Sequence, residues 1–392
     1  MLKFPYSKPE IIQLDIDAVV DTLKTGYLTQ GEKLEKFEFE LKNVFKSKNA
    51  IVCNSGTAAL HLLYNALGLG PKIGLLTSPI TFLATANAAR MCNAPVIFAD
   101  TDSKTGLLTP ETVEHALMNS KIKIKVITLV HLGGKVCDLE GIAKVAKKYD
   151  CYLVEDSCHA PGPKYFNNGK ENIIQNNCKY SIACTYSFHA IKHIAMGEGG
   201  CVTTNDERIA KIIKEKRSHG IKRLQKEMKF LPEKNAKWYY EMHELGWNYR
   251  ADELSCALGL SQLKRLELNI EKRKKLVELY YSFLTENKYI TLPLKLYNNY
   301  INLWHLFSIE IDFERLGKSR GMVMDELEKL GIGTQVHYIP LFLQPYYRKK
   351  QLITLSGAME YYQSTLSIPL YTELNKKDII YISSKINDVI SL

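Results

Sequence analysis

The sequence predicts an α/β protein: a largely parallel sheet with helices on both faces, followed by a smaller α+β domain. Two observations support this fold class. From about residue 50 to 205, short apolar runs alternate with amphipathic segments of helix length, the order that builds parallel sheets. After Asp206, longer helical tracts replace this alternation. A length of 392 residues is compatible with two to three domains, and we expect a large domain, including the N-terminal segment, over 1–248 and a smaller one over 249–392.

Strands and helices are expected to alternate through the large domain. Short apolar runs predict strands, and longer amphipathic stretches between them predict helices. The expected strands are 50–53, 73–77, 95–98, 124–130, 152–155, 183–188 and 200–204. The expected helices are 57–69, 84–91, 110–118 and 139–148. Pro110 stands at the first turn of its helix, where a missing N–H leaves no hydrogen bond unmade.

The remaining chain is expected to be more helical. Residues 206–228 are basic and predicted helical, and 250–285 form an amphipathic tract without Gly or Pro after Gly259. The Asn- and Lys-rich segment 166–179 predicts a surface loop. A mixture of strands and helices is expected over 303–311, 321–330, 334–338 and from Lys376 onward.

Composition narrows the class of protein. The net charge of +10 permits an acidic partner, which could be a nucleic acid, a membrane surface or a phosphorylated small molecule. Nine cysteines occur at irregular spacing without a Cys-x-x-Cys pair, so we expect reduced, buried thiols and no metal site. The N-terminus has no apolar signal region, and no apolar run approaches the roughly 18 residues of a membrane span. We therefore expect a cytoplasmic protein.

A turn of small residues, Asn54-Ser55-Gly56-Thr57, joins the first expected strand of the large domain to the helix that follows. Backbone N–H groups at the start of a helix point outward and attract an anion, and Thr57 adds a hydroxyl. Ser and Thr also precede helices simply as caps. The segment thus indicates either a phosphate-binding turn or an ordinary helix cap.

A carboxylate, Asp156, follows the apolar strand 152–155. In α/β proteins, ligands bind at the carboxyl ends of parallel strands. An anion beside a heterocycle raises the proton affinity of the ring nitrogen, so Asp156 could hold a protonated ring. A helix cap or a metal ligand would use the same type of side chain, and the residue alone does not decide between these roles.

Lys192 follows another apolar strand, in Ser187-Phe188-His189-Ala190-Ile191-Lys192. Lysine is almost never fully buried unless it is paired. Desolvation would lower its pKa and make the amine a nucleophile toward carbonyls. The alternative is a lysine that extends from a loop into water.

Together, the three segments supply a phosphate cup, a carboxylate for a ring nitrogen and a Schiff-base lysine, the contacts that pyridoxal 5′-phosphate requires. The chain resembles the DegT/DnrJ/EryC1/StrS family of nucleotide-sugar aminotransferases. Ala190-Ile191 before the lysine, and His337-Tyr338-Ile339-Pro340, resemble the pseudaminic acid branch in particular. The other matching motifs are Leu28-Thr29-Gln30-Gly31, Asn54-Ser55-Gly56-Thr57-Ala58-Ala59-Leu60, Thr81-Phe82-Leu83-Ala84-Thr85, Val130-His131, Glu155-Asp156-Ser157-Cys158-His159-Ala160, Gly197-Glu198-Gly199-Gly200, Arg217-Ser218-His219-Gly220 and Gly246-Trp247-Asn248-Tyr249-Arg250.

The resemblance implies the aspartate-aminotransferase-like fold of type I pyridoxal phosphate enzymes, with a mostly parallel seven-stranded sheet. It implies that Lys192 is catalytic and bonds to the cofactor, and that Asp156 pairs with the ring nitrogen. Phe82 would cover the ring, although an ordinary core position stays open for an aromatic residue. The residues expected to bind the cofactor are Gly56, Thr57, Phe82, Asp156, His159, Ser187, Lys192 and Asn248. Those expected to bind the substrate are Tyr6, Gly26, Tyr27, Leu28, Thr29, Arg250, His337, Tyr338 and Ile339.

The resemblance also implies a reaction and an assembly. The amino group of an amino acid, expected to be L-glutamate, would pass to carbon 4 of a UDP-linked 4-keto-6-deoxy-N-acetylhexosamine in pseudaminic acid or related glycan biosynthesis. Asn248 would reach the phosphate of the neighbouring subunit, which requires a homodimer with a shared site. His131 and His189 are expected to be structural. No nucleic acid or membrane partner is expected.

Three alternatives remain at this stage. One is an aminotransferase for another keto sugar, GDP- or dTDP-linked and aminated at carbon 3 or 4. A sugar dehydratase is disfavoured, because relatives of that kind replace the lysine with histidine and this chain keeps Lys192 beside His193. A nucleic-acid-binding regulator could use the basic stretch 211–226, but that stretch lacks the interleaved aromatics of single-strand binders.

Overall fold

A seven-stranded sheet forms the centre of the large part of the molecule, with the strand order β1-β9-β8-β5-β4-β2-β3. This is a computed structural model, and it describes residues 2–162, 164–167, 170–173, 178–230, 236–297, 300–349 and 354–391. The strands are β1 (Asn49–Cys53), β2 (Gly74–Thr77), β3 (Val96–Phe98), β4 (Ile124–Val130), β5 (Tyr152–Asp156), β8 (Ala183–Ser187) and β9 (Gly200–Thr204). Only β9 runs antiparallel to its neighbours, so the predicted mostly parallel sheet is confirmed.

Helices cover both faces of this sheet, as predicted. Neighbouring side chains along β8 and β9 pack into different cores on the two faces. Cys184 and Cys201 belong to one apolar core with helices α2 and α8, whereas Ala183 and Val202 belong to the other, larger core. The helices around the sheet are α2 (Glu32–Phe45), α3 (Gly56–Ala66), α4 (Leu83–Met91), α5 (Pro110–Met118), α6 (Leu139–Lys148), α7 (Glu207–Arg217) and α8 (Glu253–Leu263).

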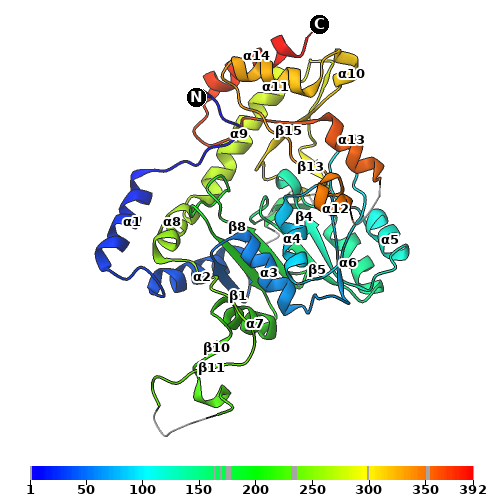
Figure 1. Cartoon of the computed structure of the whole chain (residues 1–392). Coiled ribbons are helices and arrows are strands. Elements are labelled where there is room, and N and C mark those ends of the chain that lie inside the picture. Colours follow the sequence, from blue (N-terminus) through cyan, green and yellow to red (C-terminus); the bar gives the residue numbers. More distant parts are fainter. Residues whose placement is uncertain are drawn as a thin grey trace.

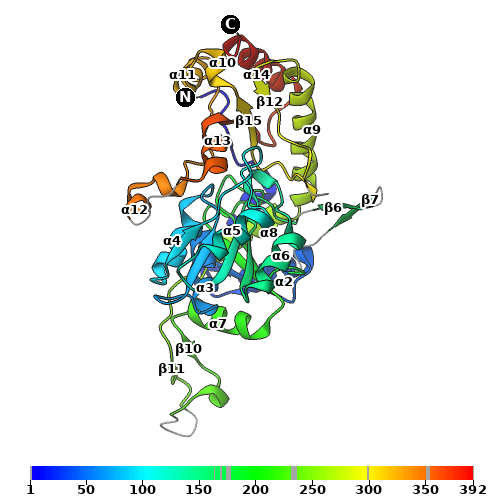
Figure 2. The ribbon, with the colours of Figure 1, turned by 90° about the vertical axis from the view of Figure 1, so that its right-hand side faces the viewer.

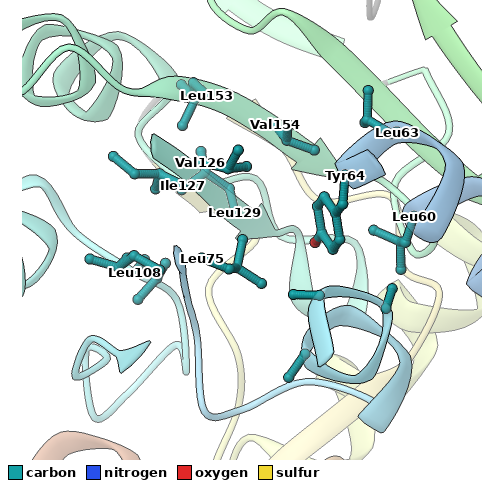
Figure 3. Close-up of a cluster of buried hydrophobic side chains, with 14 of the residues drawn as sticks. Leu60, Leu63, Tyr64, Leu75, Leu108, Val126, Ile127, Leu129, Leu153 and Val154 are labelled. Atoms are coloured by element: carbon teal, nitrogen blue, oxygen red, sulfur yellow. The ribbon is translucent and has the colours of Figure 1, made fainter. Parts of the chain in front are cut away.

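The larger core fixes the position of α3 and α4 against the strands. Figure 3 shows Tyr64 of α3 beside Leu60 and Leu63, facing the strands that carry Leu75 and Val126. The hydroxyl of Tyr64 donates to the Thr85 carbonyl at 3.2 Å and lies 2.9 Å from the Thr128 hydroxyl. Because buried hydroxyls require such partners, Tyr64 ties α3, β4 and α4 together beneath the site.

A smaller body lies above the large one in Figure 1 and contains both ends of the chain. Its three-stranded sheet has the order β12-β15-β16. Its elements are α9 (Leu266–Leu284), β12 (Ile290–Thr291), β15 (Phe307–Ile311), α10 (Phe313–Leu316), α11 (Arg320–Lys329), β16 (Thr365–Ile368) and α14 (Lys376–Val389). Phe4 joins its core, and the Phe4 N–H donates to the Gly331 carbonyl at 2.8 Å.

Helix α9 connects the two bodies along its length. Ile270 packs in the core with α2 and α8, and Leu276 packs in the core of the smaller body. The change of core partner therefore falls between these two residues. The boundary between 248 and 249 stays a prediction.

The segment predicted as a surface loop, 166–179, contains part of a hairpin. Strands β6 (Lys164–Asn167) and β7 (Lys170–Ile173) pair with each other, and β6 pairs with β14 (Tyr300–Ile301), which pairs with β13 (Leu296–Tyr297). Residues 168–169 and 174–177 lie outside the described part. Figure 2 shows the hairpin extending sideways from the body. The polar composition hid these strands, because they lack the apolar alternation that marks a strand facing a core.

A long arm follows α7, where a longer helix was predicted. The helix ends at Arg217, because His219 and Gly220 adopt positive φ angles of 63° and 69°. The chain then forms the arm around β10 (Ile221–Lys222) and β11 (Glu241–Met242), which extends below the body in Figure 1. The predicted tract 250–285 is likewise two helices, α8 and α9.

The remaining helices are short or peripheral. Helix α1 (Gln13–Thr25) packs against α8, while α12 (Pro345–Arg348) and α13 (Ser356–Ser364) precede β16. Among the described residues, no helix is both long and apolar enough to cross a bilayer.

None of the nine cysteines, all of which lie among the described residues, forms a disulfide. Burial raises the pKa of Cys53 to about 12, so this thiol stays protonated at neutral pH. Cys151, Cys158 and Cys178 are half-buried and the other six are fully buried. No group of His, Cys, Asp and Glu suited to a metal ion occurs among the described residues.

Candidate active site

A cavity of about 710 Å³ opens where the carboxyl ends of the parallel strands meet segments of the smaller body. Its walls bring together residues that are far apart in sequence. The predicted site residues that line it are Tyr6, Gly56, Thr57, Phe82, Asp156, His159, Ser187, Lys192, His337, Tyr338 and Ile339. Three of the predicted roles thus meet in one place: the helix start, the carboxylate and the lysine.

The start of helix α3 forms one wall of the cavity. Ser55 caps the helix, because its hydroxyl accepts from the Ala58 N–H at 3.1 Å. A Cβ on Gly56 would lie 2.9 Å from the Cβ of Ser187, so only glycine allows β8 and α3 to approach so closely. The first turn of a helix leaves N–H groups without backbone partners, and the hydroxyls of Thr57 and Ser187 lie beside it. This arrangement fits a phosphate group.

Asp156 ends β5 and is 5% exposed. The hydroxyl of Thr85 donates to its Oδ2 at 2.7 Å, and the Cys158 N–H donates to its Oδ1 at 3.2 Å. The Thr85 hydroxyl also lies 2.9 Å from the hydroxyl of Thr81. These donors fix the carboxylate in one orientation, while it still lines the cavity.

His159 is a neutral ring that lines the same cavity as this carboxylate. Burial lowers its pKa well below the usual 6.5. The Gly133 N–H donates to its Nδ1 at 3.2 Å, so the proton of the neutral ring is on Nε2. That nitrogen lies 3.4 Å from the hydroxyl of Tyr338, a residue carried by the smaller body.

Phe82 lies at the edge of the cavity with 58% of its surface exposed. This exposure excludes the alternative of an ordinary core position. An exposed aromatic face next to a cavity is available to stack on a flat ligand.

Lys192 extends into the cavity from the segment after β8. Burial lowers its pKa from the usual 10.5, and the nearby Cys158 and Asp156 oppose this effect. Within the part of the chain that the structure describes, no carboxylate lies within ion-pair distance of its amine. A desolvated amine without a carboxylate partner retains more of its nucleophilic, neutral form at neutral pH.

Sequence reasoning missed His305, whose Nε2 lies 3.5 Å from the Nζ of Lys192. The residue stands in Leu303-Trp304-His305-Leu306, where one polar side chain interrupts an apolar run. This polar residue in an apolar run was the feature of the sequence that could have pointed to His305. Thr85 was also missed as a partner of Asp156, although it ends a matching motif.

Two histidines expected to be structural differ in position. His131 is buried, and its Nε2 lies 3.0 Å from Oε2 of Glu155. Burial would raise the pKa of Glu155, but hydrogen bonds from His131 and Ser181 outweigh this effect and lower it. His189, in contrast, lines the cavity.

Six of the predicted site residues lie outside the cavity of the single chain: Gly26, Tyr27, Leu28, Thr29, Asn248 and Arg250. Tyr27 is 75% exposed, and the carbonyl of Leu28 accepts from the N–H of Glu253. Asn248 pairs through its backbone with Ser218 at the end of α7. Roles for these six in a site shared with a second subunit stay predictions.

A helix start suited to a phosphate, an anchored carboxylate and a half-buried lysine in one cavity are the features of a pyridoxal-phosphate-dependent enzyme of fold type I. The comparison with known families agrees. The chain belongs to the DegT/DnrJ/EryC1/StrS aminotransferase family, which matches residues 9–387.

The chain is similar to several named proteins and to several proteins of known structure. The chain is 37% identical over 387 residues to a UDP-4-amino-4,6-dideoxy-N-acetyl-beta-L-altrosamine transaminase of Campylobacter jejuni, covering 98% of this chain and 97% of that one. Helicobacter pylori PseC, an aminotransferase of pseudaminic acid biosynthesis, superposes with a TM-score of 0.87 at 30% identity and covers 99% of both chains. A Streptococcus pneumoniae sugar aminotransferase in its PLP-form superposes with a TM-score of 0.86 at 25% identity and covers 98% of both chains.

The residues of this cavity fit pyridoxal phosphate, the cofactor of the family. The close approach at Gly56 forms a cradle at the helix start that a Cβ would fill. Asp156 presents a carboxylate with a fixed orientation, and Lys192 presents an amine without a carboxylate partner among the described residues. The three groups therefore match the phosphate, the ring nitrogen and the aldehyde carbon of that molecule.

Proposed function

We propose that the chain moves an amino group from an amino acid, expected to be L-glutamate, to carbon 4 of a UDP-linked 4-keto-6-deoxy-N-acetylhexosamine. This reaction would serve pseudaminic acid or related surface-glycan biosynthesis. The observation that carries the transaminase chemistry is the half-buried Lys192 in the same cavity as the anchored carboxylate of Asp156. The choice of sugar is supported by the name of the Campylobacter jejuni relative and by the likeness to PseC.

In this proposal, the large body holds the cofactor. Gly56, Thr57 and Ser187 bind the phosphate through the helix start and two hydroxyls. Asp156 holds a proton at the ring nitrogen, and Phe82 covers the ring. Asn248 of a second subunit adds a further phosphate contact.

The bound cofactor supplies an electron sink for the carbon atom that loses or gains the amino group. The chain itself supplies the proton transfer. The Lys192 amine, once free, takes a proton from the donor carbon in the first half-reaction and gives one to the sugar carbon in the second. Its lowered pKa favours this exchange, because it brings the amine closer to a pKa at which it can both take and give a proton.

The sugar would bind between the two bodies. Tyr6, His337, Tyr338 and Ile339 line the side of the cavity that the smaller body and the N-terminal segment contribute. Burial, together with Lys192, lowers the pKa of His337 to about 3, so the ring is neutral at pH 7. The Nδ1 of His337 lies 2.8 Å from the hydroxyl of Ser367 on β16, which sets its orientation. A neutral imidazole and two phenols suit the hydroxyl and amide groups of an N-acetyl sugar.

We further propose a homodimer in which each site is completed by the other subunit. The predicted Gly26 to Thr29 contacts, Asn248 and Arg250 all lie outside the cavity of their own chain. Two apolar side chains of the arm, Phe230 and Trp238, are 73% and 69% exposed, which suits a surface buried in an assembly. The cytoplasmic location and the absence of a nucleic acid partner stay predictions.

A panel of keto sugars tests the substrate. The holoenzyme is incubated with L-glutamate and with UDP-, GDP- or dTDP-linked 4-keto-6-deoxy sugars, and the products are analysed by mass spectrometry and NMR. We expect amination of the UDP-linked N-acetyl sugar at carbon 4. Amination at carbon 3, preference for another nucleotide, or loss of water, which changes the mass in the opposite direction, would overturn the proposal.

A further inference from the structure

His305 approaches the Lys192 amine from the smaller body. Its Nε2 lies 3.5 Å from Nζ of Lys192, and the two residues are 113 positions apart. The side chain is 1% exposed and lines the cavity. Its ring centroid lies 4.3 Å from that of His159, which faces the same space. The His305 ring is thus a buried part of the cavity lining near the lysine amine, and not an exposed side chain.

The turn that carries His305 is held from two sides. Arg273 of α9 is buried and donates through Nη1 to the carbonyls of His305 at 3.2 Å and Leu370 at 2.9 Å. Trp304 adopts a positive φ of 52°, which a bulky residue keeps only where the surroundings impose it.

The glycines after β4 hold the other side of this turn. The carbonyls of Gly134 and Gly133 accept from the N–H groups of Leu303 and Leu306, both at 3.1 Å. A Cβ on Gly134 would lie 2.7 Å from the Trp304 nitrogen, so glycine is needed for this approach. Since the Gly133 N–H also binds His159, one short turn of the large body positions both rings. These contacts fix the backbone of the turn and therefore the position of the His305 ring relative to Lys192.

The ring of His305 is neutral. Burial lowers its pKa well below the usual 6.5, and the neighbouring histidines, Lys192 and Arg273 lower it further. No hydrogen-bond partner reaches its Nδ1 among the described residues. The titratable groups around the Lys192 amine are Asp156, Cys158, His159, His193, His305 and His337.

We propose that His305 is a positioning residue for Lys192: its Nε2 accepts a hydrogen bond from the lysine amine and directs the amine nitrogen toward the cofactor. This inference rests on the role of Lys192 in the proposed function. An N–H donated to Nε2 leaves the lone pair of a neutral amine free to attack a carbonyl or accept a proton. The same bond stabilises the charged form of a buried amine, whose pKa would otherwise fall further.

Two matched variants separate this role from simple packing. In His305→Gln, the side-chain amide reaches about as far as Nε2 and offers an acceptor there. In His305→Asn, the amide reaches only the position of Nδ1. Both variants keep a polar side chain of similar chemistry. His115→Gln, at an exposed position on α5, is the control for loss of a histidine.

The first measurement uses the full-length chain freed of cofactor. Competitive acetylation of Lys192 is followed by peptide mass spectrometry from neutral to alkaline pH, with surface lysines as internal standards. We expect the midpoint for Lys192 to fall by about one pH unit in His305→Asn, because a charged amine loses its acceptor, and to stay near the wild-type value in His305→Gln and His115→Gln. Equal midpoints in the two His305 variants would overturn the proposal.

The second measurement uses the holoenzyme. We expect kcat to fall about tenfold or more in His305→Asn with little change in the KM of the amino donor, and to recover in His305→Gln. Thermal unfolding of each variant shows whether folding is affected. Unchanged kcat in a folded His305→Asn protein contradicts the proposal. Failure of the wild type to aminate the predicted sugar contradicts the proposed substrate instead, and leaves the acetylation result in force.

Discussion

At the scale of single residues, the site depends on groups that hold other side chains in place. Asp156 would be a flexible carboxylate at a strand end without the hydroxyl of Thr85 on its Oδ2. Thr85 is in turn held by its own carbonyl, which accepts from Tyr64 in the core. This series of hydrogen bonds, from Tyr64 through Thr85 to Asp156, therefore fixes the carboxylate relative to the core.

Thr85→Val tests this support. The substitution keeps the shape of the side chain but removes the donor to Asp156, and a hydrogen bond to a charged group contributes about 1.5–3 kcal/mol. We expect cofactor affinity to fall about tenfold, measured as the Kd from titration of the cofactor-free protein by absorbance. Thr291→Val, at an exposed position on β12, should leave the Kd unchanged. An equal Kd for Thr85→Val and wild type would show that the bond is dispensable.

The buried histidines of the site predict an acid-sensitive fold. Burial lowers the pKa of His159, His193 and His305 well below 6.5, so the unfolded chain binds more protons than the folded one below that pH. The free energy of unfolding should therefore fall as the pH drops below about 6.5, by up to about 1.4 kcal/mol per pH unit for each group.

Urea unfolding at several pH values measures this slope. Replacement of one such group, in His305→Gln, should make the slope shallower than in wild type, because one fewer group gains a proton on unfolding. A slope that does not change in this variant would contradict the neutral state of that ring in the folded protein.

At the scale of elements, the contact of α3 with β8 forms the predicted phosphate site. Helix α3 begins at Gly56 because Ser55 caps it, and its first turn lies against Ser187 at the end of β8. Asp156 stands at the end of another strand, β5. Parallel strands bring these ends to one edge of the sheet, which is why three distant motifs form one cavity.

Gly56→Ala is expected to disturb that contact. The new Cβ would lie 2.9 Å from the Cβ of Ser187, so the helix start must shift away from β8. We expect at least about a tenfold rise in the Kd of pyridoxal phosphate, with a smaller effect on pyridoxal, which has no phosphate to bind. In Gly70→Ala, a Cβ meets no atom within 4 Å, and this variant serves as the control. An equal rise in the Kd of pyridoxal phosphate and in the Kd of pyridoxal would indicate a general folding defect instead.

At the scale of the whole molecule, the single chain holds most of a site. Its two bodies enclose the cavity, and the arm around β10 and β11 reaches away from it in both views (Figures 1 and 2). Asn248 lies near the base of this arm, outside its own cavity. The proposed second copy, which would complete the site, would account for both the exposed arm and the place of Asn248 outside its own cavity.

Mixed dimers test the shared site. Lys192→Ala and Asn248→Ala each damage every site in their own homodimers. In a mixed dimer, one site combines the intact Lys192 of one chain with the intact Asn248 of the other. We expect turnover to rise above that of either parent when the two variants are unfolded together and refolded, and not when either is refolded alone. No gain on mixing, with dimers confirmed by sedimentation, would place Asn248 outside the shared site.

The order of strands and helices could be predicted because local patterns encode it. The helices 110–118 and 139–148 and the strand 124–130 are found at the predicted residues, since capping residues and apolar periods mark their ends. The hairpin of β6 and β7 escaped prediction, because its stability comes from pairing with β14 and from no apolar period of its own. The prediction of a long helix after Asp206 was wrong, because the turn at His219 and Gly220 depends on contacts with the chain near Trp247.

The sequence alone determined the family and the cofactor, and it predicted three groups to hold that cofactor, because Gly56, Asp156 and Lys192 lie in short local motifs. Only the tertiary structure showed which side chains support them. Thr85 meets Asp156 across 71 positions, and His305 meets Lys192 across 113. These pairs arise where the two bodies and the ends of the parallel strands converge, and no local period in a chain records which distant residue will lie there.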